Sequence, residues 1–146
     1  MLDMFSKIVV PFDNSELSKK ALEMAITLAK QDEKITLDVI TAVDTNSSVY
    51  VYGAYTSIDP IRKSMLEDAK KTLNDIEKKL SDVPNKTQTH LLEGSPGKSI
   101  IDFINREQPD LVVMGSRGLS GLKEVFLGSV SHYVVQKSPR PVFIVK

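Results

Sequence analysis

The stretch Leu111-Val112-Val113-Met114-Gly115-Ser116-Arg117-Gly118 is a short apolar run that passes directly into a glycine-rich loop. Consecutive apolar residues that stop at a glycine are typical of a strand buried on both faces of a parallel sheet. In parallel sheets flanked by helices, ligands bind at the carboxyl ends of the strands. The stretch therefore predicts the type of sheet and the edge on which a binding site would lie.

Strand-like and helix-like patterns alternate along the rest of the chain. Apolar runs rich in β-branched residues predict five strands, over residues 5–12, 34–43, 86–92, 111–114 and 142–145. Apolar residues at helical spacing, opened by a capping residue or a proline, predict four helices, over residues 15–31, 60–80, 95–108 and 129–137. This alternation predicts an α/β fold in one domain, residues 1–146, built on an open doubly wound parallel sheet with helices on both faces.

Residues 44–59 interrupt this alternation. They show no helical period, and they include Tyr50, Tyr52 and Tyr55, three of the four tyrosines in the chain. Long loops in compact domains often carry function. We therefore expect a long surface loop here, although the residues themselves do not identify its role.

Composition and charge exclude several classes of protein. The 146 residues are 41% hydrophobic and 26% charged, which is near the average for a soluble globular domain. Lys plus Arg is 19 and Asp plus Glu is 19, so the formal net charge of zero offers no general attraction to nucleic acid or to an anionic membrane. The chain has no cysteine, no apolar run of the ~18 residues that a membrane span needs, and no signal-peptide pattern at its start. We expect a cytoplasmic protein with no nucleic-acid or membrane partner.

Glycines and hydroxyls in the last third of the chain have a spacing that suits an anion. Gly115 and Gly118 follow the fourth predicted strand, and Gly128-Ser129 opens the last helix. Glycine lets backbone N–H groups approach an anion closely, and a helix N-terminus adds roughly half a positive charge. The hydroxyls of Ser129 and Ser131 are further donors. Each glycine alone is explained more simply by a turn, but the joint spacing Gly-x2-Gly-x9-Gly-Ser/Thr arises by chance in roughly 0.6% of chains this long.

Other nucleotide-binding and catalytic motifs fail on inspection. Gly97-Lys98-Ser99 looks like the end of a phosphate-binding P-loop, but the glycine that this motif needs at position 92 is Leu92. His90 and His132 have no third partner in view, which favours surface or packing roles over a metal ligand or a general base. Ser129 lacks the Gly-x-Ser-x-Gly pattern of a hydrolase nucleophile.

The glycine spacing after a Val-Val-Met strand resembles the ATP-binding signature of the universal stress protein family. Residues 8–13, 93–96 and 139–142 resemble the family as well, so the likeness covers essentially the whole chain. The resemblance implies an adenine nucleotide alpha hydrolase-like sheet with strand order 3-2-1-4-5, bound ATP and a homodimer. In that order the strand over residues 142–145 lies at the edge of the sheet. An apolar edge strand favours pairing with a second copy about a two-fold axis.

The resemblance also implies roles for individual residues. The adenine and ribose would be contacted by Asp13 and the backbone around Val43. The ribose–phosphate side would be lined by Gly115, Arg117 and Gly118. The phosphates, with Mg²⁺ bound to them, would be held by Gly128, Ser129, Val130 and Ser131, and Pro11 and Met114 at the ends of two predicted strands complete the expected site. From the residues alone, Asp13 is equally well explained as a carboxylate at a helix N-terminus, and Arg117 as a solvated loop residue.

These inferences favour an ATP-binding stress-response module that senses or signals through its bound nucleotide. A slow ATPase or an autophosphorylating protein is the first alternative, and a structural dimer without nucleotide is the second. Phosphoryl transfer needs an oriented nucleophile as well as charge stabilisation. No general base or arginine finger is evident, which argues against an efficient enzyme, and the complete glycine signature argues against the structural dimer.

Overall fold

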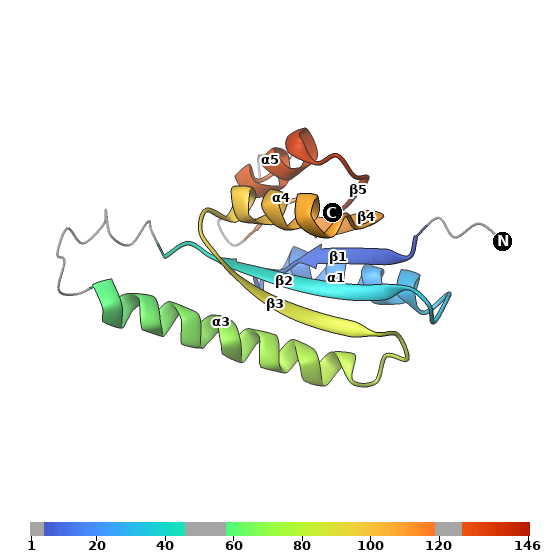
Figure 1. Cartoon of the computed structure of the whole chain (residues 1–146), viewed down its shortest axis with the longest axis horizontal. Coiled ribbons are helices and arrows are strands. Elements are labelled where there is room, and N and C mark those ends of the chain that lie inside the picture. The colour runs from blue at the N-terminus through green and yellow to red at the C-terminus, as the bar shows by residue number, and fades with distance from the viewer. Residues whose placement is uncertain (1–4, 46–57, 119–126) are drawn as a thin grey trace.

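The computed structural model describes residues 5–45, 58–118 and 127–146 and shows one parallel sheet flanked by helices (Figure 1). The strands are β1 (Lys7–Pro11), β2 (Thr36–Val43), β3 (Thr87–Glu93), β4 (Leu111–Gly115) and β5 (Val142–Val145). The helices are α1 (Glu16–Ala29), α3 (Ile58–Leu80), α4 (Pro96–Glu107) and α5 (Ser129–Lys137). Every neighbouring pair of strands is parallel, and the strand order is β3-β2-β1-β4-β5. The predicted α/β fold and strand order are confirmed.

Two apolar clusters, one on each face of the sheet, hold the helices against it. Alternate residues of β1 point to opposite faces, so that Ile8 and Val10 join the cluster with α1 and α3, and Val9 joins the cluster with α4 and α5. All three side chains are fully buried. This burial on both faces explains why the central strands read as continuous apolar runs in the sequence.

The amino ends of β1 and β4 are tied together by Asp110. Its Oδ2 accepts hydrogen bonds from the backbone N–H groups of Ser6 (2.9 Å) and Lys7 (2.9 Å) and from the Ser6 hydroxyl (2.6 Å). Burial opposes ionisation of this carboxyl, but the hydrogen bonds outweigh that effect, so the pKa of Asp110 lies below its usual value. The first strand, predicted from residue 5, begins at Lys7, where its pairing with β2 starts.

Two glycines are required where helices approach other elements closely. A Cβ on Gly97 in α4 would lie 2.8 Å from Cδ1 of Tyr133 in α5, so a larger residue would force these two helices apart. A Cβ on Gly115 would lie 2.8 Å from Cβ of Leu17 and 2.9 Å from its carbonyl carbon, so α1 packs directly on the end of β4. The glycine of Gly97-Lys98-Ser99 thus serves helix packing.

Most of the long loop predicted over residues 44–59 lies outside the described residues, and so do Tyr50, Tyr52 and Tyr55. At its end, α3 begins at Ile58, so Pro60 lies in the first turn of this helix, where the missing N–H of proline costs no hydrogen bond. No helix within the described part of the chain is both long and apolar enough to cross a membrane.

Candidate functional site

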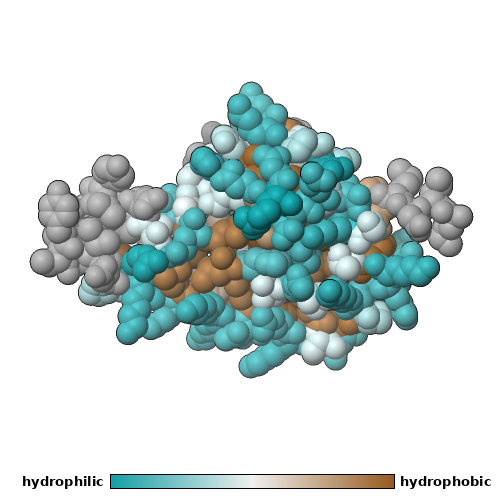
Figure 2. Space-filling model, viewed as in Figure 1, coloured by the Kyte–Doolittle hydropathy of each residue, from teal (hydrophilic) through white to brown (hydrophobic). Residues whose placement is uncertain are grey.

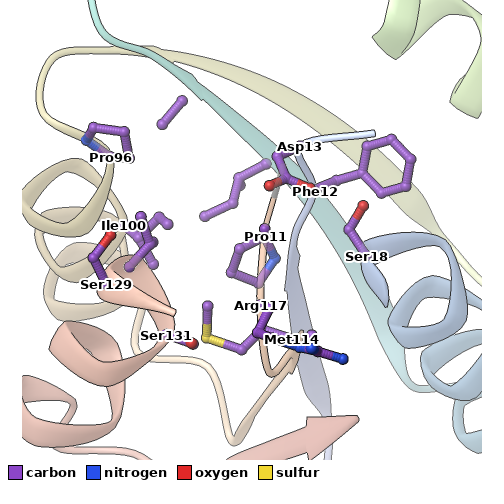
Figure 3. A pocket seen from close by; sticks show the side chains of 15 residues that line it. Pro11, Phe12, Asp13, Ser18, Pro96, Ile100, Met114, Arg117, Ser129 and Ser131 are labelled. Carbon is purple, nitrogen blue, oxygen red and sulfur yellow. The ribbon is translucent and has the colours of Figure 1, made fainter. Parts of the chain in front are cut away.

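A cavity of about 170 Å³ opens at the carboxyl edge of the sheet, beside the ends of β1, β2 and β4 (Figure 3). After β1 the chain leads to α1 on one face of the sheet, and after β4 it leads to α5 on the other face. Because the two neighbouring strands lead away from each other, a crevice remains at their carboxyl ends. Crevices at this place are the usual ligand sites of doubly wound sheets.

The cavity brings together most of the residues predicted for the site. Nine of the eleven line it: Pro11, Asp13, Met114, Gly115, Arg117, Gly118, Ser129, Val130 and Ser131. They come from the ends of β1 and β4, from the segments that follow these strands, and from the first turn of α5. Both ends of the glycine signature therefore lie at one opening, although residues 119–126 between them are outside the described part of the chain.

Val43 is one of the two predicted residues that do not line the cavity. It is buried, and its carbonyl accepts a hydrogen bond from the N–H of Gly94 in the direction of β3 (2.9 Å). Ala42 and Ile40 line the cavity instead. The Ile40 carbonyl accepts a hydrogen bond from the N–H of Phe12 (2.8 Å), so it points toward the end of β1. Backbone groups two residues apart in a strand point to the same side, so those of Ala42 point the same way but lie beyond the end of β1. The structure thus places Ala42, next to Val43, at the cavity and leaves the Val43 side chain away from it.

Gly118 and Gly128 keep side chains out of the space where segments of the site meet. A Cβ on Gly118 would lie 2.5 Å from Oδ2 of Asp13, and one on Gly128 would lie 3.3 Å from Cα of Arg117. Gly128 has a φ of −65°, which any residue adopts, so close approach is the reason for glycine there. Gly128 does not line the cavity itself. Its N–H donates to the carbonyl of Ser116 (2.7 Å), which ties the start of α5 to the end of β4.

The N-terminus of α5 forms one wall of the cavity. The N–H of His132 donates to the carbonyl of Gly128 (2.8 Å), and the N–H groups of Ser129, Val130 and Ser131 precede this bond and have no partner within the helix. These three residues line the cavity. The N-cap residue, Gly128, has no side chain with which to cap them. Backbone donors at the positive end of a helix make this wall suitable for an anion such as phosphate.

The hydroxyls of Ser129 and Ser131 face different surroundings. Ser129 is exposed and lines the cavity. Ser131 is 3% exposed, and its hydroxyl donates to the carbonyl of Ser116 (2.7 Å), with the carbonyl of Gly128 also within reach (3.1 Å). The expected role of a hydroxyl donor to an anion is therefore open to Ser129, whereas the Ser131 hydroxyl is engaged within the protein.

Asp13 contributes both to the turn after β1 and to the cavity. Its Oδ1 accepts a hydrogen bond from the N–H of Ser15 (3.0 Å), and Ser15 caps α1 by accepting from the N–H of Ser18 (3.2 Å). Asn14 lies between them with a φ of 67°, a left-handed conformation that asparagine tolerates well. The Asp13 side chain also points toward the cavity (Figure 3). The two explanations for Asp13, support of a helix start and contact with a ligand, are therefore compatible.

Six residues that the sequence analysis did not assign also line the cavity: Phe12, Ser18, Ile40, Ala42, Pro96 and Ile100. Two sequence spacings group four of them in pairs but do not show that these pairs face the cavity. Alternation along β2 places Ile40 and Ala42 on one face, and a spacing of four places Pro96 and Ile100 on one side of α4. Their apolar side chains, with Pro11 and Met114, give the cavity an apolar part beside the polar wall of α5.

Acidic and histidine side chains are not clustered as a metal site would require. In residues 5–45, 58–118 and 127–146, no three His, Cys, Asp or Glu side chains lie close enough together to hold a metal ion. His90 packs against Phe103, with ring centroids 4.9 Å apart, and its Nε2 lies 3.4 Å from Oδ2 of Asp38. His132 is exposed on α5. The environment of His90 agrees with the packing role expected from the sequence.

The fold and the site together define a class of protein. Its members have an open, five-stranded parallel α/β sheet with a cavity at the carboxyl ends of two neighbouring strands, and this cavity has an apolar part and a wall formed by a helix N-terminus. The sequence profile of the Universal stress protein family matches residues 4–146. The chain is 38% identical to Universal stress protein YxiE of Bacillus subtilis, over 98% of this chain and 100% of that protein. It is 31% identical to Universal stress protein MJ0531 of Methanocaldococcus jannaschii, over 99% of this chain and 84% of that protein. The chain belongs to the universal stress protein family.

Solved structures share the fold along the whole chain. Protein MJ0577 of Methanocaldococcus jannaschii gives a TM-score of 0.87 at 29% identity, over 98% of this chain and 96% of that chain. A universal stress protein family protein from Arabidopsis thaliana, solved with AMP bound, gives 0.72 at 19% identity, over 97% and 91%. The universal stress protein from Archaeoglobus fulgidus in complex with dAMP gives 0.71 at 21% identity, over 98% and 99%.

Proposed function

We propose that this protein binds ATP, with Mg²⁺ on its phosphates, in the cavity at the carboxyl edge of the sheet. The observation that carries the proposal is the wall formed by α5, where the N–H groups of Ser129, Val130 and Ser131 lie at the same opening as Gly118. The AMP and dAMP bound by two proteins of the same fold support an adenine nucleotide as the ligand. The whole chain, residues 1–146, would act as one cytoplasmic nucleotide-binding module of a stress response.

The two parts of the cavity suit the two ends of a nucleotide. Ile40, Pro96 and Ile100 offer apolar surface to a planar base, and the backbone groups of Ala42 face the same opening. The amides of α5 suit the phosphates. Mg²⁺ prefers oxygen ligands and commonly joins a protein through the phosphates of its substrate, so the phosphates would carry the ion.

Mass measurement of the nucleotide released from purified, denatured protein tests the proposal directly. We expect ATP, and we expect Gly118→Val and Gly128→Val to abolish its binding, because a side chain at either position fills space beside Asp13 or Arg117 that the folded site needs empty. Ser64→Val on the exposed face of α3 adds similar bulk away from the cavity and should bind ATP normally. Normal ATP affinity in both glycine variants, once each is shown to be folded by circular dichroism, would contradict the assignment of the site.

We also propose that two copies of the protein pair through β5. β5 is the last strand in the order, and only β4 pairs with it among the described residues. The carbonyl of Pro141 accepts a hydrogen bond from the N–H of Val112 in β4 (3.0 Å), and the carbonyl of Val145 accepts one from the N–H of Ser116 (2.9 Å). Because the backbone groups of successive residues in a strand point to opposite sides, those of Val142 and Ile144 point away from β4. Phe143 beside them is 40% exposed. An apolar edge with outward donors and acceptors favours antiparallel pairing with the same edge of a second copy.

A further inference from the structure

The buried carbonyl of Ser116 connects the two ends of the glycine signature. It accepts hydrogen bonds from the N–H of Gly128 (2.7 Å) and from the hydroxyl of Ser131 (2.7 Å). A carbonyl oxygen has two lone pairs, so it can satisfy both donors. Ser116 is 4% exposed and Ser131 is 3% exposed, so water cannot readily replace either partner.

We propose that Ser131 is a positioning residue of the nucleotide site: its hydroxyl fixes the N-terminus of α5 against the end of β4 and does not bind phosphate. The inference rests on the proposed function, because it concerns how the nucleotide site is held in shape. It departs from the role that the glycine signature implies for Ser131, in which the hydroxyl contacts the phosphates directly.

The direction of the Ser131 hydroxyl carries the first step of the argument. A serine hydroxyl has one proton to donate, and the Oγ of Ser131 lies 2.7 Å from the carbonyl oxygen of Ser116 and 3.1 Å from that of Gly128, both within the protein. Turning the hydroxyl toward a phosphate would remove one donor from a buried carbonyl, which costs free energy. Ser129, which is exposed at the cavity, can donate to a phosphate without that cost.

The place of the bond in the site carries the second step. The backbone at Gly115 and Gly118 forms one side of the cavity, and the amides at the start of α5 form another. Binding sites for charged groups need their donors held within about 0.5 Å of the productive geometry. The pair of bonds to Ser116 joins these two sides, so loss of the Ser131 hydroxyl would let the α5 amides shift relative to the glycine loop.

Ser131→Thr and Ser131→Val make a matched pair of variants, because their side chains have nearly the same shape and differ in the hydroxyl. Two quantities should be measured: the hydrogen-exchange rate of the Gly128 amide in nucleotide-free protein, by NMR, and the dissociation constant for Mg²⁺-ATP, by calorimetry. For Ser131→Val we expect exchange about tenfold faster and ATP binding about tenfold weaker, which is the effect of losing one buried hydrogen bond. Ser131→Thr should stay close to the wild type in both. Ser131→Ala replaces Ser131→Val if the larger side chain prevents folding.

Val134→Ala controls for a general loss of stability. Val134 is fully buried in the same helix and does not line the cavity, so this variant should melt at a lower temperature and bind ATP normally.

Weaker ATP binding by Ser131→Val with unchanged Gly128 exchange would identify the hydroxyl as a direct phosphate ligand and overturn the inference. Faster exchange with unchanged ATP binding would overturn it as well, because Ser131 would then support the fold alone. A wild-type protein that binds no ATP would refute the proposed function, while the exchange rates would still decide whether Ser131 holds α5 to β4.

Discussion

The carboxylate of Asp110 holds the amino ends of β1 and β4 together, and its contribution to stability depends on its charge. The pKa of Asp110 in the folded protein lies below the value of about 3.9 expected in an unfolded chain. Folding therefore favours the ionised form. The resulting stabilisation is fully present above the unfolded pKa and is lost as the pH falls through the lower, folded pKa.

We therefore expect Asp110→Asn to reduce the free energy of unfolding near pH 7 and to have a smaller effect at the acid end. The amide can offer one oxygen to the donors on Ser6 and Lys7, but without the negative charge that strengthens those bonds. Urea unfolding at a series of pH values from 7 down to 2 measures the effect. Asp82→Asn, at an exposed position after α3, is the control. Parallel pH profiles for wild type and Asp110→Asn would show that this carboxyl does not contribute in the way described.

At the same scale, the sequence predicts which residues gather at the cavity better than it predicts what each group faces. Ser131 lies at the start of a helix as predicted, but the shorter of its two hydroxyl contacts is to a carbonyl 15 residues away, and a contact at that separation leaves no local pattern in the sequence. The backbone around Val43 is predicted to contact a ligand, and within that stretch Ala42 is the residue that lines the cavity. In a strand buried on both faces, apolar residues occupy every position, so the sequence does not show which alternate set faces the ligand.

At the scale of elements, the contact between α4 and α5 rests on the absence of a side chain at Gly97. Gly→Ala in the middle of an exposed helix normally stabilises a protein by about 1 kcal/mol, because alanine is the better helix former. In α4 the added Cβ would lie 2.8 Å from the ring of Tyr133. We therefore expect Gly97→Ala to destabilise the protein by about 1–3 kcal/mol, which is typical of an overpacked contact.

A double-mutant cycle with Tyr133→Ala isolates this contact. Removal of the ring should make Gly97→Ala much less costly, and the free energies of unfolding from denaturant titration give the coupling. Ser99→Ala, two residues further along the same helix, is the control and should show additive behaviour. Equal cost of Gly97→Ala with and without the ring would mean that Tyr133 is not what limits the approach of the two helices.

The elements themselves were largely predictable, because apolar periodicity and helix-start signals agree along most of the chain. The last helix and the last strand have the predicted bounds, Ser129–Lys137 and Val142–Val145. The errors lie at ends. The first strand was predicted two residues too long at its start and one at its end, because apolar residues continue beyond the ladder that pairs with β2. Pairing partners decide where a strand stops, and they are distant in the sequence.

At the scale of the whole molecule, the outer edge of β5 makes the proposed dimer testable with one substitution. Val142→Pro removes an N–H that points away from β4, so it should weaken pairing with a second copy while leaving the β4–β5 ladder intact. Sedimentation should show the wild type at about twice 16.2 kDa and Val142→Pro shifted toward the monomer. Val142→Ala, which keeps the N–H, should remain dimeric. A wild-type protein that stays monomeric at micromolar concentration would rule the dimer out.

If ATP binds as proposed, it should be hydrolysed slowly. Asp13 is the acidic side chain among the described residues that lines the cavity, and its Oδ1 already accepts a hydrogen bond from the turn before α1. We therefore expect phosphate release from saturating ATP far below the ~1–100 s⁻¹ of kinases. Phosphate release by wild type and Asp13→Ala is the measurement. A rate within that range that disappears in Asp13→Ala would identify the protein as an enzyme, with Asp13 as a catalytic residue.

The position of β1 at the centre of the sheet also bears on how the protein folds, because its two neighbouring strands lie at very different distances from it in the sequence. β1 has one neighbouring strand close to it in the sequence, since Thr36 lies 30 residues from Ser6. Its other neighbour arrives late, since Asp110 lies 104 residues from Ser6, and closing so long a loop costs conformational entropy. The cavity lies on this second seam, with the end of β1 on one side and β4 and α5 on the other. A ligand there would contact both sides of this seam, so it would hold together two parts of the chain that are far apart in the sequence.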